Sequence, residues 1–591
     1  MAMNEADLEL KQVQFQDTDR DERVFMVLDR FERAQAARTH QEEIWREALR
    51  IYRFKKNLRP VYDTEGNIIL LKGKVPQGEE WRSNIFIPYA FALVETVQPR
   101  MTAAMFASRP IFFVLGRSPE DHNHAPAVEA LLDFQAEVSG LQEAWKVVQK
   151  SALIFGTGVG KIGWGRAGPV GGRSAYVGPL LKPVYTPDFY PDPSAMNLDE
   201  CMWVIHRIFM PLDRLRKLAE EPDNDGVYDL AAIERLAGTQ APEAPMRDQL
   251  ERALGATGHF SDRPGENIVE LLEMWDVIQN RVIVVANRQV VIRDTENPYA
   301  HGQLPFVVIK DHLPIDSFWG IGEVEPIIDL QRELNTTRNQ RIDNVSLALA
   351  APVFINMMAL PGTVDPASFR WEKGKVYPVM GPANQAVFIP AIPDVTAGSY
   401  REEMQVKADM QTVLGVHDVV QGRWPVRRET ATAVIRLMQE ANARFAEKIR
   451  EFADSGLSVV ARHYHALDAQ FLSVEMAVRI LGAGAVSFIN IRPDEIQGAF
   501  DFRVASVAAE PAAAREERLS KLVELSPLLL QSGVVDPYRL IRQILILAEI
   551  PPDQVMMPRA EAAAGVTPGG GTQQVTPLEA LARVAGMGAG S

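Results

Sequence analysis

Residues 323–349 read EVEPIIDLQRELNTTRNQRIDNVSLAL, and this pattern predicts one long helix. The apolar residues gather on one side of that helix: Ile327, Leu330, Leu334, Ile342, Val345 and Leu349. Polar residues populate another side: Arg332, Thr336, Asn339 and Asp343. A helix with these two sides suits contact with a neighbouring element on one face and exposure on the other.

The residues that follow predict a turn back into a second long helix. Residues 350–393 are rich in Pro and Gly with short runs typical of strands, and residues 399–414 are again helical. Two helices joined by a small β unit can stack beside the same pair from other copies around a ring. The pattern therefore predicts an elongated subunit of a cyclic homo-oligomer.

A third helix is predicted after an irregular segment. The segment GVHDVVQGRWPVRR at residues 415–428 leads into a very long helical pattern from Glu429 to about Phe471. Apolar residues recur along this pattern on one continuous face: Val434, Met438, Ala441, Phe445, Ile449 and Phe452. We expect a kink at Gly456, because glycine is a common cause of helix bending.

The first half of the chain mixes helices and strands, so the fold class is predicted as α+β. Helices are expected at residues 21–53, 84–108, 127–138 and 141–155. Strands are expected at 174–183 and 202–209 and in a three-strand meander over 268–293, with turns at Asn280-Arg281 and Asn287-Arg288. Residues 222–265 are rich in Asp, Pro, Gly and Ala and are interpreted as a surface insertion.

Composition narrows the class of protein. The 591 residues carry a net charge of −15, which disfavours a protein that grips DNA tightly but suits an acidic ring that surrounds DNA without holding it. No apolar run is long enough to span a membrane, no secretory signal is visible, and a single cysteine, Cys201, rules out an internal disulfide. We therefore expect a soluble protein of cytoplasmic origin.

No motif predicts catalysis, a cofactor or a metal. The sequence Gly158-x-Gly160-x-x-Gly163 matches a dinucleotide fingerprint in form, but a helix precedes it and a strand follows, which reverses the order that phosphate binding needs. We interpret it as a glycine-rich turn from helix to strand. His463 and His465 lie two residues apart on a predicted helix and point in different directions, so they are interpreted as polar surface residues.

The irregular segment before the long helix carries the most unusual cluster. Arg423, Arg427 and Arg428 flank Trp424 on a short connection between two long helices. Arginines and an exposed aromatic ring can contact phosphates and sugars or bases of nucleic acid. The alternative is that these arginines pair with nearby acidic side chains and only hold the segment in place.

Several stretches resemble the portal proteins of tailed bacteriophages, in particular those of podoviruses. WRSNIFIPYAFALVETVQPRMTAAMFASRP at Trp81–Pro110 is similar to an early helix of these portals. Leu304–Ile355 resembles the stretch that leads into the first stem helix. RRETATAVIRLMQEANARFAEKIREF at Arg427–Phe452 is similar to the start of the long helix that follows the tunnel loop. The resemblance covers about residues 39–558 and leaves out the insertion and the C-terminal tail.

The resemblance implies a portal-type subunit with a helical wing, a two-helix stem, a small β-containing clip, a long kinked helix and a helical crown. The implied parts are a flexible N-terminus (1–20), wing (21–320), first stem helix (321–349), clip (350–393), second stem helix (394–414), tunnel loop (415–428), long wing helix with a β segment (429–510), crown (511–558) and disordered tail (559–591).

The same resemblance implies the contacts. The tunnel loop residues Arg423, Trp424, Arg427 and Arg428 would line the DNA channel. The stem residues Arg332, Arg338, Arg341 and Lys407 would face the channel or the next subunit. The clip residues Phe354, Phe369, Trp371, Tyr377 and Phe388 would contact partners.

The implied function is a twelve-fold ring through which double-stranded DNA is packaged and ejected. The implied partners are the terminase, the major capsid protein and a tail adaptor, with no membrane and no cofactor. The ring would assemble in the host cytoplasm and end in the virion. Two alternatives stay open from the residues alone: another oligomeric virion protein, such as a minor capsid or adaptor subunit, and a nucleotide-dependent enzyme built around residues 156–163.

Overall fold

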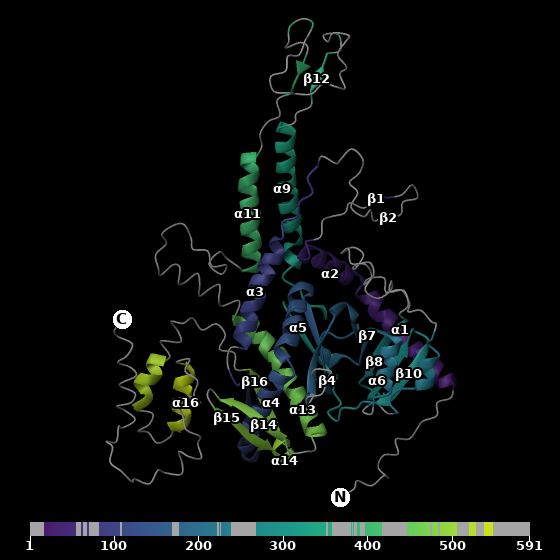
Figure 1. The fold of residues 1–591 in the computed structure, drawn as a ribbon, viewed down its shortest axis with the longest axis vertical. Coiled ribbons are helices and arrows are strands. Elements are labelled where there is room, and N and C mark those ends of the chain that lie inside the picture. The colour runs from purple at the N-terminus through teal and green to yellow at the C-terminus, as the bar shows by residue number, and fades with distance from the viewer. Residues whose placement is uncertain are drawn as a thin grey trace. The chain divides into compact units, whose positions relative to one another are not determined.

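The computed structural model divides the chain into two compact units (Figure 1). Unit 1 comprises Met1–Arg100, Glu143–Ile162 and Leu181–Val434, and unit 2 comprises Met101–Gln142, Gly163–Leu180 and Ile435–Ser591. The structure describes residues 17–54, 61–62, 68–69, 82–106, 109–167, 176–221, 224, 226–237, 267–349, 353–356, 358, 380, 382, 387–390, 396–415, 446–472, 476–482, 485–504, 519–527 and 537–547. Helices and strands mix in both units, as the α+β prediction requires.

A five-stranded antiparallel sheet organises unit 1, in the order β10-β9-β8-β7-β6. Its strands are β6 (Phe189–Pro191), β7 (Trp203–Pro211), β8 (Ile268–Asp276), β9 (Arg281–Ala286) and β10 (Val290–Glu296). The predicted meander is confirmed, and both predicted turns lie at its corners. Asn287 and Arg288 have positive φ angles of 46° and 59°, which is the geometry of a tight two-residue hairpin turn.

Both faces of this sheet are covered, and alternate residues of each strand serve the two faces. On β9, Ile283 and Val285 pack with Val27 and Phe31 of α1 (Asp17–Ala37). On the opposite face, Val282 and Val284 join a core that contains residues of α2 (Thr39–Tyr52), α6 (Leu212–Ala219) and α7 (Leu230–Glu234).

The segment interpreted as a surface insertion contributes to this core. Its helix α7 begins after Asp229, whose side chain accepts a hydrogen bond from the Ala232 backbone amide. Ala232, Ile233 and Leu236 are buried in the same cluster as β8 and β9. One face of α7 therefore belongs to the interior, because its apolar residues contribute to the core on one face of the sheet, whereas Leu230 and Glu234 stay exposed.

A second sheet, in the order β11-β4-β5, contains the glycine-rich sequence. Its strands are β4 (Thr157–Ala167), β5 (Tyr176–Val184) and β11 (Phe306–Lys310), and α5 (Leu141–Phe155) precedes β4. Gly156 makes the predicted helix-to-strand turn with φ of 82°, and a Cβ there would lie 1.8 Å from the Gly320 carbonyl oxygen. Only glycine permits this close approach, so the glycines serve backbone packing.

The single helix predicted over residues 21–53 is wrong, because the chain breaks at Arg38 into α1 and α2. The guanidinium of Arg38 is buried and donates to the carbonyl oxygens of Phe189 and Pro187, at 2.6 Å each. It also binds Glu42 at 2.8 Å and lies over the Tyr190 ring at 3.6 Å. This network fixes the corner between the two helices.

Two long helices and a small hairpin complete unit 1. Helix α3 (Tyr89–Met105) begins in this unit, and η5 (Glu325–Ile327) leads into α9 (Ile328–Leu349). After α9 come β12 (Phe354–Ile355), β13 (Val387–Phe388) and α11 (Thr396–Leu414). Figure 1 shows α9 and α11 side by side, with β12 beyond the ends of both. The predicted order of helix, β unit and helix is confirmed.

Unit 2 packs helices against short antiparallel strands. Its helices are α4 (Pro119–Val138), α13 (Ser458–Phe471), α14 (Pro493–Ile496) and α16 (Pro537–Leu547). Its strands are β3 (Phe112–Gly116), β14 (Met476–Gly482), β15 (Ala485–Ile491) and β16 (Phe500–Val504). Directly before α13 lies a π-helical turn, η8 (Ala453–Leu457), which contains Gly456 at the position of the predicted kink. Among the described helices, none has the length and apolarity that crossing a membrane requires.

We predict that Arg38→Met lowers the free energy of unfolding of unit 1 by about 3–5 kcal/mol, because it leaves Glu42 and two carbonyl oxygens buried without their donor. Urea unfolding followed by hydrogen exchange of peptides from β6–β10 measures this. The control is Arg33→Met, where the side chain is 70% exposed and a change within about 0.5 kcal/mol is expected. Equal effects of both substitutions would contradict this role of Arg38.

Candidate functional site

The helix pair α9 and α11 carries most of the residues that the sequence singled out. The two helices pack along each other and bury Leu334 of α9 and Val406 and Met410 of α11. The rest of α11 is largely exposed, including Tyr400, Met404 and Val413. One thin apolar seam thus holds the pair together within the chain, and additional contacts are needed to fix its register.

A single carboxylate supplies such contacts. Glu403 of α11 is buried, and its oxygens accept from Lys407 at 2.7 Å, from Arg338 of α9 at 3.3 Å and from Arg341 of α9. Burial on its own would raise the pKa of Glu403, but the hydrogen bonds and charges of Lys407 and Arg341 lower this pKa to about 2. Arg341 also lies over the Tyr400 ring at 3.9 Å. The carboxylate therefore stays charged and links the two helices.

All four basic stem residues named from the sequence are engaged within their own chain. Three of them bind Glu403, and Arg332 binds Glu47 of α2 at 2.9 Å and Asp329 at 2.8 Å. Arg341 is buried, whereas Arg332 and Arg338 keep part of their surface exposed. Contacts of these residues with DNA or another subunit stay a prediction, and such contacts would compete with the ion pairs described.

A feature that the sequence reasoning missed covers the polar side of α9. The extended residues 83–88, which we call the strap, and the first turn of α3 run along this helix, and they bond to side chains of α9 spaced four residues apart. Backbone amides of the strap donate to Asp343 Oδ1 (from Ser83, 2.6 Å), Asn339 Oδ1 (from Ile85, 2.7 Å) and Asn335 Oδ1 (from Ile87, 2.9 Å). The Ala90 amide in the first turn of α3 continues the series with a bond to Gln331 Oε1 at 3.0 Å.

The spacing of the two partners explains the fit of the strap. Four helical residues advance about 6 Å, and two extended residues advance about 6.6 Å, so alternate strap residues meet successive turns of α9. The Nδ2 of Asn339 returns a bond to the Ile85 carbonyl, and the Nε2 of Gln331 returns one to Ile87. Asn339 and Asp343 had been placed on an exposed face of the helix. They instead bind a remote part of the same chain.

The hairpin beyond the stem presents aromatic surface. Phe354 of β12 and Phe388 of β13 lie opposite each other, with ring centroids 6.2 Å apart. They are 59% and 63% exposed, respectively. The other three aromatic residues predicted for the clip, Phe369, Trp371 and Tyr377, lie outside the described residues. The same is true of the tunnel loop residues Arg423, Trp424, Arg427 and Arg428.

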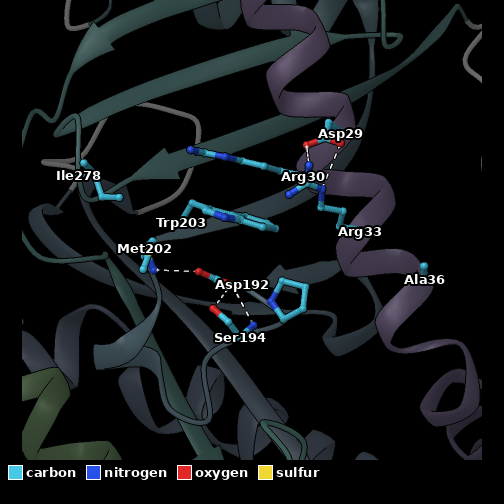
Figure 2. A pocket seen from close by; sticks show the side chains of 10 residues that line it. Asp29, Arg30, Arg33, Ala36, Asp192, Ser194, Met202, Trp203 and Ile278 are labelled. Atoms are coloured by element: carbon cyan, nitrogen blue, oxygen red, sulfur yellow. Dashed lines mark hydrogen bonds and ion pairs between the residues drawn. The ribbon is translucent and has the colours of Figure 1, made fainter.

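A shallow groove of about 640 Å³ lies on unit 1 between α1 and the edge of the large sheet (Figure 2). Trp203, Met202 and Ile278 form its apolar side. Its polar groups already bind each other: Arg33 pairs with Asp29 at 2.8 Å, Arg30 pairs with Asp276 at 2.7 Å, and Asp192 accepts from Ser194 and Met202. This groove therefore presents no side chain poised for acid or base chemistry.

One set of side chains has the composition of a metal site. His312 Nε2 lies 3.9 Å from Asp311 Oδ2 and 4.0 Å from Glu323 Oε2, and the two carboxylates are buried. The three residues also fit a purely structural role, in which ion pairs and backbone bonds hold this loop in place. The backbone amides of Asp311 and Glu323 donate to the carbonyl oxygens of Gly156 and Leu153, respectively. The expectation that the chain holds no metal stays a prediction.

The interpretation of His463 and His465 as surface residues is wrong. His463 is buried in α13, and His465 packs against Phe500 and Phe502 while its Nε2 lies 2.9 Å from the Ile496 carbonyl oxygen. Burial lowers the pKa of His465, although the Ile496 carbonyl opposes this shift. Both side chains face the interior because α13 packs against α4, α14 and β16.

We predict that Asn335→Ala combined with Asn339→Ala speeds amide exchange in the strap by about tenfold to a hundredfold, because the Ile85 and Ile87 amides lose their acceptors. Hydrogen exchange of peptides covering residues 82–90 measures this change. Thr336→Ala is the control, since its exposed hydroxyl bonds only to Arg332 of its own helix. Unchanged exchange in the double variant would show that the strap is held by other contacts.

The family comparison agrees with the architecture of these elements. The family described as Phage SU10 portal protein matches residues 173–581, which is more than half of the chain. The match includes α9, α11, the hairpin between them and α13, and also the 222–265 segment and most of the C-terminal tail, which the resemblance had left out. Portal proteins are structural components of the phage virion. The chain therefore belongs to the phage portal protein family.

Proposed function

We propose that copies of this chain close into a twelve-fold ring that surrounds double-stranded DNA at one vertex of the capsid. The observation that carries this proposal is the apolar surface that one copy leaves open at the hairpin end of the stem. Phe354 and Phe388 are exposed there, and so are Leu349 of α9 and Tyr400 of α11. Exposed apolar residues of this kind are typical of a protein interface, and a second copy would supply matching ones.

The charge distribution supports a channel that lets DNA slide. The chain carries a net charge of −15, so a ring of many copies is strongly acidic. Four basic residues of the described stem, Arg332, Arg338, Arg341 and Lys407, are already bound to Glu403, Glu47 and Asp329, whereas Arg401 of α11 is exposed. A phosphate that approached them would have to displace these carboxylates, which keeps the attraction between stem and DNA weak.

The contacts that guide DNA are proposed for the tunnel loop at residues 415–428. Arg423, Arg427 and Arg428 would contact phosphates, and Trp424 would offer a flat face to sugars or bases. Exposed ionic contacts of this kind contribute about 1 kcal/mol or less each, which is compatible with movement of the DNA.

The same proposal assigns docking partners to the parts of the subunit. The hairpin end would meet the terminase during packaging and a tail adaptor afterwards, and the wing would meet the major capsid protein. Hydrolysis of ATP belongs to the terminase in this scheme. The glycine-rich sequence at 156–163 is occupied by backbone packing against Gly320 and Val148, which leaves it unsuited to phosphate.

We predict that Phe354→Ser combined with Phe388→Ser shifts the chain from rings to smaller species, because neighbouring copies lose apolar contact at the tip. Native mass spectrometry at a fixed protein concentration measures the distribution. The matched control is Phe25→Ser, an equally exposed aromatic position on α1 far from the stem in sequence. Rings of unchanged stability in the double variant would contradict the assignment of this surface.

For the tunnel loop, we predict that Arg423→Ala combined with Trp424→Ala leaves ring assembly intact and changes the length or retention of packaged DNA. An in vitro packaging assay with purified terminase and procapsids measures this. Loss of the ring would show that the loop has a structural role. Normal rings with normal packaging would show that the loop does not line the narrowest part of the channel.

A further inference from the structure

Unit 2 buries an acidic side chain at the contact between α4 and α13. Asp468 of α13 and Gln135 of α4 are fully buried, and Gln135 Nε2 donates to Asp468 Oδ1 at 2.7 Å. The two residues are 333 positions apart in the sequence, so this bond ties two remote segments of the unit together. We call the two side chains the clasp.

One oxygen of each clasp residue has no hydrogen-bond partner within the described part of the chain. These atoms are Gln135 Oε1 and Asp468 Oδ2. If Asp468 is ionised, both oxygens can only accept hydrogen bonds. Gln135 Oε1 and Asp468 Oδ2 therefore cannot bond to each other. A buried carboxylate with one hydrogen bond is costly, and an unpaired buried amide oxygen adds to that cost.

No neighbouring group compensates the charge of an ionised Asp468 among the described residues. The nearby Tyr176 hydroxyl of β5 donates to the Pro179 carbonyl oxygen. Tyr464 lies on the same helix one turn away and is itself buried. No lysine or arginine of the described chain forms an ion pair with Asp468.

Charged groups on the elements packed against α13 bind elsewhere. On α4, Glu129 accepts from the Val114 amide and Asp133 pairs with Arg109. On β16, Asp501 pairs with Arg117, and on α14, Glu495 accepts from the Arg492 amide. On α13 itself, the His465 ring binds the Ile496 carbonyl. The clasp thus lies near the buried side chains of Tyr176 and Tyr464 and forms no ion pair among the described residues.

We propose that Asp468 carries a proton in the folded protein and donates its Oδ2–H to Gln135 Oε1. The carboxyl and carboxamide groups then form two reciprocal hydrogen bonds, and one proton satisfies both unpaired oxygens. This makes the clasp a pH-sensitive link between α4 and α13. Loss of the proton breaks one of the two bonds and leaves a buried charge.

The titration of the group agrees with this geometry. Burial raises the pKa of Asp468 to about 8, against the smaller opposing effect of the bond from Gln135. In the unfolded chain, aspartate loses its proton near pH 3.9. The folded unit thus holds a proton that the unfolded chain releases. Its free energy of unfolding therefore falls as pH rises from about 4 to about 8. The equilibrium constant of unfolding increases by up to about tenfold per pH unit over this range.

Infrared difference spectroscopy of the purified full-length chain tests the protonation directly. At pH 7, the wild type should show the C=O band of a protonated carboxylic acid, and Asp468→Asn should lack that band. Asp494→Asn, a change at an exposed aspartate of α14, is the control and should retain it. A wild-type spectrum without a protonated-carboxyl band at pH 7 would overturn the proposal.

The same variants give a second measurement that does not depend on the spectrum. An asparagine at position 468 can form both bonds at any pH of the experiment. Its amide oxygen accepts from Gln135, and its amide nitrogen donates to Gln135 without taking up a proton from solution. The intrinsic rate of amide exchange rises with pH in any protein. In peptides from α4 and α13, the exchange rate of the wild type and of Asp494→Asn should rise with pH more steeply than this intrinsic rate. For Asp468→Asn, the rise should equal the intrinsic one. An equal excess in all three proteins would overturn the clasp as the pH-sensitive element.

Discussion

The corner at Arg38 is the constraint on which the architecture of unit 1 depends. Helix α1 packs on one face of the five-stranded sheet, and α2 contributes to the core on the other face, so the chain must turn around the sheet edge between them. The Arg38 guanidinium holds this turn, because its donors serve the carbonyl oxygen of Pro187 before β6, that of Phe189 at the start of β6, and the Glu42 carboxylate. The guanidinium groups of Arg38 and Arg207 both lie over the ring of Tyr190 of β6, at 3.6 Å and 5.3 Å from its centroid.

The helix pair α9 and α11 follows the same principle, in which a thin apolar seam is fixed by buried ion pairs. Glu403 gathers three cations from both helices, and the strap binds α9 through a different set of side chains. Arg332, Arg338, Arg341 and Lys407 thus contribute to holding the subunit together through ion pairs within the chain.

The sequence predicted the elements whose signals are local. The turns of the meander follow from Asn280 and Asn287, which adopt positive φ more readily than most residues, and the order of helix, hairpin and helix follows from periodicity. The break at Arg38 carries no such signal, because arginine favours helices and no glycine or proline lies there. The strap could not be predicted because the partner of Ile85 lies 254 residues away, although the regular spacing of Gln331, Asn335, Asn339 and Asp343 was visible. The burial of His463 likewise depends on partners from remote segments.

The central claim is that this portal chain forms a closed ring with a channel. Negative-stain electron microscopy of the purified wild-type chain tests it most directly, since particles viewed along the axis reveal symmetry and a central hole together. The account predicts uniform rings with one stain-filled hole and twelve-fold symmetry. A uniform population of single subunits, at concentrations where the chain is folded, would contradict it.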